Sequence, residues 1–223
     1  DPACGSGNFL TETYLSLRRL ENEILQELQG GQMVLGYDNM NPIQVSSSQF
    51  YGIEINDFAV TVAKTALWIA ESQMMKETES IVLMHLDFLP LKTNAFIHEG
   101  NALQVDWESV IPKYQLSYIM GNPPFVARAG RTKAKDSSSK GMLDDTQKTD
   151  RLNVFGEDLG NVDYVACWFK KAAVFTKNTA IRCAFVATDS ICQGQQIYPI
   201  WKNILQDDIY INFAYKFFKW NSE

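Results

Sequence analysis

The chain has 223 residues, of which 46% are hydrophobic and 21% are charged, the composition of an ordinary globular domain. This length fits one sizeable α/β domain, so we assign residues 1–223 to a single domain. A formal net charge of −6 argues weakly against the chain as the main clamp on a nucleic acid, whose phosphates attract basic surface. No segment has the roughly 20 apolar residues of a membrane span, so we expect no membrane association.

Cysteine and histidine are too few and too scattered to suggest a metal site. The chain contains four cysteines and two histidines at unrelated spacings: Cys4, Cys167, Cys183, Cys192, His85 and His98. We predict no metal ion and no disulfide, and reduced thiols point to the cytoplasm. The sequence begins at Asp1 without an initiator Met, so we expect it to belong to a longer protein.

The first half of the chain alternates predicted helices and strands. Apolar residues recur at helical spacing before a plausible stop at residues 30–31: Leu10, Tyr14, Leu17, Leu20, Ile24 and Leu28. Residues 50–54 are predicted to form a short strand that ends in the carboxylate Glu54. A second helix is expected from Asn56 or Asp57 to Met74, and residues 95–98 and 116–120 are predicted as buried strands.

The second half begins with a segment that has no apolar pattern. Residues 126–160 are predicted to form a long mobile loop, in which seven basic residues outnumber four acidic ones between residues 128 and 151. Residues 165–175 then predict a helix, 181–187 a strand, 197–205 a helix and 209–218 a strand or hairpin arm. Asp163 could cap the helix or line a ligand pocket, and we favour the cap. This alternation predicts a largely parallel sheet with helices on both faces.

A glycine turn runs directly into the first predicted helix. Gly5 and Gly7 allow the backbone to approach a ligand closely, and the helix N-terminus adds partial positive charge. Glu54, at the end of the next predicted strand, could accept hydrogen bonds from both ribose hydroxyls of a nucleoside. Each feature is weak alone, because a helix-entry turn and a solvated strand end are common, but together they indicate a nucleoside site.

Residues 122–125, Asn-Pro-Pro-Phe, follow the predicted strand 116–120. The two prolines fix the backbone and lack N–H donors, which leaves carbonyl oxygens free to accept. The Asn122 side-chain oxygen and the Pro123 carbonyl could together accept both hydrogens of a flat amino group. Phe125 offers a ring on which a planar group can stack. This segment predicts chemistry on an exocyclic amine.

These motifs resemble the amino-methyltransferases, and within them the N6-adenine DNA methyltransferases of restriction–modification type, in their type I and type IIG form. Residues 1–10 are similar to the family's cofactor motif, and residues 122–125 to its catalytic motif in the adenine-favouring form. The resemblance implies a Rossmann-like class I fold, with a mostly parallel sheet of the seven-stranded type and helices on both faces. It also implies S-adenosyl-L-methionine as cofactor and, as substrate, an adenine flipped out of double-stranded DNA.

The resemblance assigns residues to three roles. The expected cofactor-binding residues are Asp1, Ala3, Gly5, Gly7, Asn8, Glu54, Ile55, Asn101 and Ala102. The expected catalytic residues are Asn122, Pro123, Pro124 and Phe125. The flipped base would meet Phe125 and either Phe218 or Trp220. The excess of basic residues, and not the resemblance, suggests that the loop with Arg128 and Arg131 closes on the DNA backbone, and a solvated surface loop is an equally good interpretation. A target-recognition region, and a nuclease either fused or separate, would lie outside this chain.

Other functions fit parts of the same pattern. An N4-cytosine DNA methyltransferase would use the same amine grip, although that group tends to carry Ser before the prolines. RNA or protein-glutamine methyltransferases can share the Asn-Pro-Pro-aromatic motif. A non-catalytic DNA-binding or assembly module is a further alternative, but it would have no reason to keep Gly5, Gly7, Glu54, Asn122 and Phe125 together.

Overall fold

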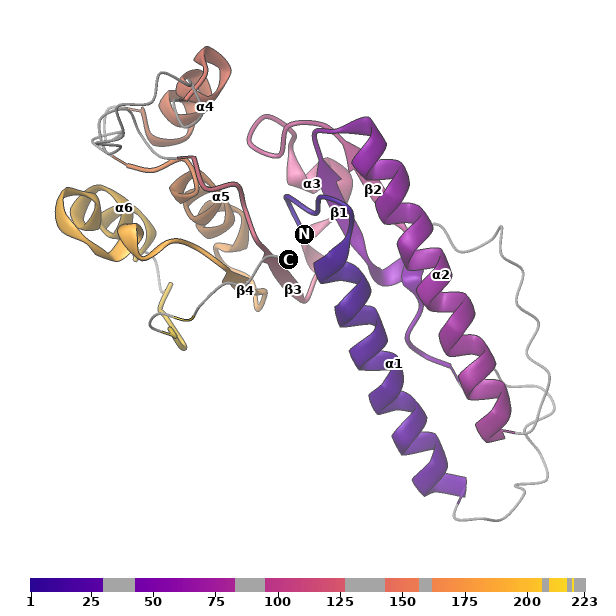
Figure 1. Cartoon of the computed structure of the whole chain (residues 1–223). Coiled ribbons are helices and arrows are strands. Elements are labelled where there is room, and N and C mark those ends of the chain that lie inside the picture. Colours follow the sequence, from indigo (N-terminus) through magenta and orange to yellow (C-terminus); the bar gives the residue numbers. More distant parts are fainter. Residues whose placement is uncertain are drawn as a thin grey trace. The chain divides into compact units, whose positions relative to one another are not determined.

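The computed structural model describes residues 1–29, 43–82, 95–126, 143–156, 162–205, 209–215 and 218. By the density of its contacts the chain divides into two compact units, Asp1–Ala102 and Leu103–Glu223. Each unit has its own pair of parallel strands and its own helices. In Figure 1 the first unit runs from indigo to magenta and the second from pink to yellow.

The first unit combines two long helices with two strands. Its elements are α1 (Asn8–Gln29), η1 (Ser47–Gln49), β1 (Tyr51–Glu54), α2 (Asp57–Val82) and β2 (Phe96–Glu99). β1 and β2 pair in parallel, with Glu54 opposite Glu99. The two long helices lie side by side (Figure 1). The four elements predicted between residues 10 and 98 are therefore present, but β2, predicted as a buried strand, buries only Ile97 of its four residues.

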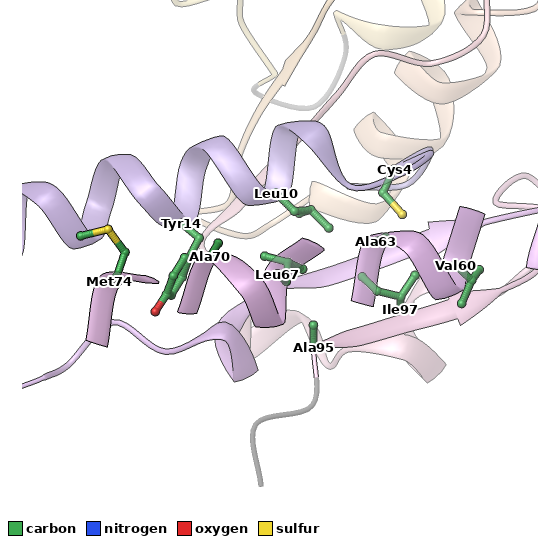
Figure 2. Close-up of a cluster of buried hydrophobic side chains, with 10 residues drawn as sticks. All are labelled: Cys4, Leu10, Tyr14, Val60, Ala63, Leu67, Ala70, Met74, Ala95 and Ile97. Atoms are coloured by element: carbon green, nitrogen blue, oxygen red, sulfur yellow. The ribbon is translucent and has the colours of Figure 1, made fainter. Parts of the chain in front are cut away.

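The core of the first unit lies between α2, α1 and the strands. Figure 2 shows its buried side chains, which are Cys4, Leu10, Tyr14, Val60, Ala63, Leu67, Ala70, Met74, Ala95 and Ile97. α2 contributes five of them, from Val60 to Met74, at the three- and four-residue spacing that places side chains on one helix face. The small residues Ala63 and Ala70 let the neighbouring elements approach α2 closely.

The buried face of α1 differs from the predicted one. Leu10 and Tyr14 are buried, but Leu17, Leu20, Ile24 and Leu28 are exposed. Arg18 is buried in their place and donates to the Thr78 hydroxyl of α2 at 2.6 Å, and it also pairs with Glu21. The buried face of α1 is formed by side chains four residues apart, some of which are polar. Apolar periodicity alone therefore does not reveal this face.

The second unit has shorter elements. They are α3 (Trp107–Val110), η2 (Lys113–Gln115), β3 (Tyr118–Gly121), α4 (Asp145–Phe155), α5 (Ala166–Thr176), β4 (Arg182–Phe185), η4 (Asp189–Cys192), η5 (Gly194–Gln196) and α6 (Ile197–Ile204). β3 and β4 pair in parallel, and Gly121 lies opposite Phe185. The α/β class is confirmed. The described residues form two two-stranded sheets, so a single sheet of the seven-stranded type stays a prediction.

Two further expectations need correction. Residues 143–156 are not loop, because they contain α4, which begins at a capping box between Asp144 and Gln147. The buried Asp150 anchors this helix by accepting from Gln104 at 2.8 Å and from the Tyr164 hydroxyl at 3.0 Å. The other correction concerns residues 209–215, which form no strand with any described segment. Residues 127–142 and 157–161 lie outside the described residues.

None of the helices in the described ranges is both long enough and apolar enough to span a membrane.

Candidate active site

The glycine turn of the first unit directly precedes α1 and lies beside β1, since Cys4 N donates to Ile53 O. Gly5 and Gly7 have φ angles of +54° and +87°, in the left-handed region that side chains disfavour. The turn closes through a hydrogen bond from Gly7 N to Cys4 O at 2.8 Å, and Ala3 N donates to the Asp1 carboxylate at 2.9 Å. A Cβ at Gly7 would lie 3.0 Å from Ala63, whereas a Cβ at Gly5 would meet no atom within 4 Å. The backbone at Gly5 therefore has open space on the side where a Cβ would project.

Glu54 lies against this turn, as the sequence predicts. One carboxylate oxygen accepts from Gly5 N at 2.9 Å, and the other accepts from Asn56 N at 3.0 Å. Ile55 is 67% exposed immediately after it. The structure thus brings the Glu54 carboxylate, with the exposed Ile55 next to it, to the open backbone of Gly5, which is 49 residues from Glu54 in the chain. These are the groups that hold ribose hydroxyls and a base in nucleoside sites.

Gly52 of β1 supports the turn through its close approach to Cys4. This role is not among the predictions made from the sequence. A Cβ at Gly52 would lie 2.7 Å from Cys4 Sγ and 2.8 Å from Ile97 Cδ1. Cys4 N also donates to Ile53 O at 3.1 Å, so the turn rests directly on β1. A glycine inside a strand pattern is the signal that could have indicated this close approach. Burial raises the pKa of the Cys4 thiol to about 11, which agrees with a packing residue rather than a nucleophile.

Asn101 and Ala102 follow β2. Gly100 N donates to Glu54 O at 2.8 Å, so the end of β2 lies beside the end of β1, where Glu54 is. Ala102 is buried and Asn101 is half-buried. The predicted cofactor residues Asp1, Ala3, Gly5, Gly7, Asn8, Glu54, Ile55, Asn101 and Ala102 therefore all belong to the first unit, at the turn and at the carboxyl ends of its two strands.

Lys171 of α5 holds the segment that follows Ala102. Its ammonium donates to Leu103 O at 3.0 Å and to Val105 O at 2.6 Å, and it lies 5.5 Å from the centroid of the Trp107 ring. Burial lowers the pKa of Lys171 to about 8, although nearby acidic residues, Asp106 and Asp150, raise it. The sequence gives no signal for this lysine, because nothing in its spacing connects it with residues 103–107.

The Asn-Pro-Pro-Phe motif follows β3 in the second unit. Val186 N donates to Gly121 O at 3.0 Å, so the motif begins where β3 and β4 end together. Pro123 is fully buried and Phe125 is 44% exposed. The Asn122 side-chain oxygen is buried, and no donor in the described part of the chain reaches it. A buried acceptor without a donor costs free energy, and such groups in folded proteins call for an explanation.

Asp163 does not cap α5, which corrects the prediction. The N-cap residue is Val165, without a side-chain capping bond, and only the main-chain oxygen of Asp163 accepts from Ala166 N, at 3.1 Å. The Asp163 carboxylate, 8% exposed, instead accepts from the Ser190 hydroxyl and from Gln196 Nε2. Its side chain points away from the helix start because Ser190 and Gln196 provide the donors.

The remaining predicted residues are less fully described. Phe218 is 62% exposed, while Trp220, Arg128 and Arg131 lie outside the described residues. No three His, Cys, Asp or Glu side chains within the described ranges gather in a way that could hold a metal ion.

The family described as MmeI, DNA-methyltransferase domain, matches residues 1–223. DNA methyltransferase A of Bacillus subtilis (strain 168) is 41% identical over 225 residues, which cover 99% of this chain and 24% of that protein. The chain belongs to the MmeI DNA-methyltransferase domain family. It is a DNA methyltransferase domain of restriction–modification type, as the resemblance in its motifs predicts.

A solved structure extends this assignment to the fold. The type IIL restriction–modification enzyme MmeI, determined in complex with DNA, matches with a TM-score of 0.86 and 42% sequence identity. The match covers 100% of this chain and 28% of the MmeI chain. The domain described here therefore spans about a quarter of the length of the relatives it matches.

Proposed function

We propose that the chain transfers a methyl group from S-adenosyl-L-methionine to the exocyclic N6 amine of an adenine flipped out of double-stranded DNA. The observation that carries this proposal is the buried Asn122 side-chain oxygen, for which the described residues provide no donor. It lies in an Asn-Pro-Pro-Phe segment at the end of a strand, beside an exposed aromatic ring. The amine of a base stacked on that ring would supply the missing donor.

The cofactor fits the residues at the glycine turn. Glu54 would accept from both ribose hydroxyls, the open backbone at Gly5 would admit the ligand, and Ile55 would cover an adenine face. Further contacts would come from Asp1, Ala3, Gly7, Asn8, Asn101 and Ala102. The bound cofactor would supply an electrophilic methyl group on a positively charged sulfur. We place this chemistry on a class I methyltransferase fold with a mostly parallel sheet of the seven-stranded type.

The amine would be held by the catalytic motif. Asn122 Oδ1 and the Pro123 carbonyl accept its two hydrogens, and Pro124 contributes to the rigidity of the loop because its φ is fixed. The two bonds draw the nitrogen toward tetrahedral geometry, so its lone pair points at the methyl group. Phe125 stacks on the base and limits its rotation. The nitrogen gains the methyl group and releases one proton, and the orientation provides much of the acceleration.

The DNA would be held by residues beyond the motif. Phe218 or Trp220 would contact the flipped base, and Arg128 and Arg131 would bind phosphates. Recognition of a particular sequence, and any nuclease, would come from fused or separate regions of a restriction–modification system in the cytoplasm. The MmeI structure was determined in complex with DNA, which supports double-stranded DNA as the partner.

The test uses the intact protein, duplex DNA and S-adenosylmethionine labelled on its methyl group. After digestion of the DNA to nucleosides, mass spectrometry identifies the labelled product, beside an Asn122→Ala control. Label in N6-methyladenine that disappears in the control supports the proposal. Label in N4-methylcytosine would overturn the adenine assignment, and label on RNA or protein alone, or on nothing, would overturn the DNA reaction.

A further inference from the structure

A buried carboxylate in the second unit has one oxygen that no donor among the described residues reaches. Asp163 Oδ2 accepts from the Ser190 hydroxyl and from Gln196 Nε2 at 2.9 Å. Asp163 Oδ1 is buried, and no donor within the described residues reaches it. Asp163 N in turn donates to Gln196 Oε1 at 2.7 Å, so the pair of residues is locked in one orientation. The carboxylate therefore cannot easily rotate to share its two bonds between both oxygens.

The segment that holds Asp163 begins at the same strand ends as the catalytic motif. Asn122 directly follows β3, and β4 leads through Val186, whose N–H donates to Gly121 O, into η4, which contains Ser190. Ligands of open α/β sheets bind beyond the carboxyl ends of the strands. Asp163 is thus held in place by Ser190 and Gln196, which belong to the segment that follows β4 at this edge of the sheet.

Two acceptors in the second unit are left without donors. In the described part of the chain, the buried carbonyl or carboxylate oxygens without a partner are Asn122 Oδ1 and Asp163 Oδ1. Asn122 directly follows β3, and Asp163 is hydrogen-bonded to Ser190 of η4, the element that follows β4. An unsatisfied buried acceptor is costly, and the cost is larger for a carboxylate than for an amide. A bound ligand with N–H groups would remove this cost.

We propose that Asp163 Oδ1 accepts a hydrogen bond from a nitrogen-borne donor of the bound ligands. This inference rests on the proposed function. Two sources carry that chemistry. One is the α-ammonium of the methionine part of the cofactor, and the other is the amine of the substrate base, one hydrogen of which would be shared between Asp163 and either Asn122 or the Pro123 carbonyl. Asp163 is then a ligand-binding residue outside the two motifs by which the chain resembles its family, and Ser190 and Gln196 are the positioning residues that aim its free oxygen.

The Asp163→Asn variant separates this role from a structural one. Gln196 Nε2 and the Ser190 hydroxyl need an acceptor, so the new amide oxygen takes the place of Oδ2. The amide nitrogen then takes the place of Oδ1 and presents donors where the ligand needs an acceptor. A purely structural Asp163 would tolerate this exchange. A ligand-binding Asp163 would lose affinity or turnover while the melting temperature stays close to that of the wild type.

The matched control is Ser190→Ala. It removes one donor to Oδ2 and leaves Oδ1 in place, so we expect a lower melting temperature and a smaller loss of ligand binding than in Asp163→Asn. If Asp163→Asn also lowers the melting temperature, ligand binding by the two variants is compared at temperatures at which both are folded to the same extent. A larger loss of binding or turnover in Asp163→Asn supports the proposal, and equal losses overturn it.

The titration uses the intact protein with S-adenosylmethionine and with 5′-methylthioadenosine, which lacks the amino-acid part. In Asp163→Asn, a Kd for S-adenosylmethionine about 10- to 100-fold higher, with methylthioadenosine unchanged, identifies the ammonium as the donor. An unchanged Kd for S-adenosylmethionine, together with a fall of about 10- to 100-fold in kcat/KM for DNA, identifies the base amine as the donor. No change in either overturns the inference, as expected if Oδ1 binds only water. Failure of the wild-type protein to bind S-adenosylmethionine would overturn the proposed function instead.

Discussion

Glu54 in the first unit and Asn122 in the second both stand at the end of a parallel strand, but their side chains differ in hydrogen bonding. Glu54 uses each carboxylate oxygen to accept from a main-chain N–H, at 2.9 and 3.0 Å. The Asn122 oxygen is buried, and the described residues offer it no donor. One site is satisfied without a ligand, and the other is not.

This difference separates two ways of preparing a site. At Glu54 a ligand must compete with the N–H groups of Gly5 and Asn56, but in return the carboxylate is already oriented against the turn. At Asn122 a ligand meets no competitor, so all of its hydrogen-bond energy counts toward binding or catalysis. We therefore expect changes at Glu54 to act mainly on cofactor affinity and changes at Asn122 mainly on turnover.

The largest expected effect is that of Asn122→Ala. Loss of the amide oxygen removes an acceptor that holds the amine, and kcat for methyl transfer should fall about 10²- to 10³-fold, the range seen when one oriented polar group is removed from an active site. The KM for S-adenosylmethionine should stay near the wild-type value. Asn122→Asp is the matched control because it keeps an acceptor oxygen, and it should retain more activity than Asn122→Ala. Equal activities of the two variants would contradict a role as acceptor.

Glu54→Gln should have the next largest effect. The amide keeps one acceptor oxygen but loses the charge and the second acceptor, so the KM for S-adenosylmethionine should rise about 10- to 100-fold. At saturating cofactor, kcat should change little. Steady-state kinetics over a wide range of cofactor concentrations checks both numbers. A fall in kcat without a change in KM would place Glu54 in the chemical step instead.

Gly52→Ala tests how the turn is supported. The added methyl group would lie 2.7 Å from Cys4 Sγ and 2.8 Å from Ile97 Cδ1, and such overpacking should cost about 1–3 kcal/mol of unfolding free energy. The same substitution in a Cys4→Ala background should cost less, because the sulfur is gone. Urea denaturation of the four proteins forms a double-mutant cycle. An equal cost in both backgrounds would show that Gly52 and Cys4 do not interact.

The smallest expected effect is on the pH dependence of stability. The pKa of Lys171 is lowered to about 8 from 10.5, chiefly by burial, so between these values the unfolded chain holds a proton that the folded chain has released. The free energy of unfolding contributed by Lys171 therefore rises with pH through that window and is lowest below about pH 8. Compared with the wild type, Lys171→Met should show a less positive slope between pH 8 and 10 in denaturant titrations, and identical slopes would refute this.

Local sequence patterns predicted most of the elements, and the reasons for success and failure are physical. β1, α2 and the glycine turn follow from residues that are close in the chain. The contact of Glu54 with the turn, 49 residues away, follows from the general arrangement of nucleoside sites rather than from local patterns. The buried face of α1 could not be found from apolar spacing, because Arg18 is buried through its bonds with Thr78 and Glu21. Apolar spacing does not predict α4, because the anchor of this helix is the polar contact of Asp150 with Gln104 and Tyr164.

The catalytic motif shows the same limit of prediction from local sequence patterns. The motif contains an amide, two prolines and an aromatic ring, and the structure places them at the end of β3, as predicted from the sequence. The sequence does not predict that the Asn122 oxygen is buried without a donor, nor that Asp163 turns from the helix start toward Ser190 and Gln196. Both depend on side chains that approach from distant segments.

The most direct test of the account is calorimetric titration of S-adenosylmethionine into three forms of the intact protein, the wild type, Glu54→Gln and Asn122→Ala. If Glu54 holds the cofactor and Asn122 holds the amine, Asn122→Ala binds the cofactor as the wild type does, and Glu54→Gln binds it about 10-fold or more weakly. Equal weakening in the two variants, or weakening in Asn122→Ala alone, would contradict this division of roles.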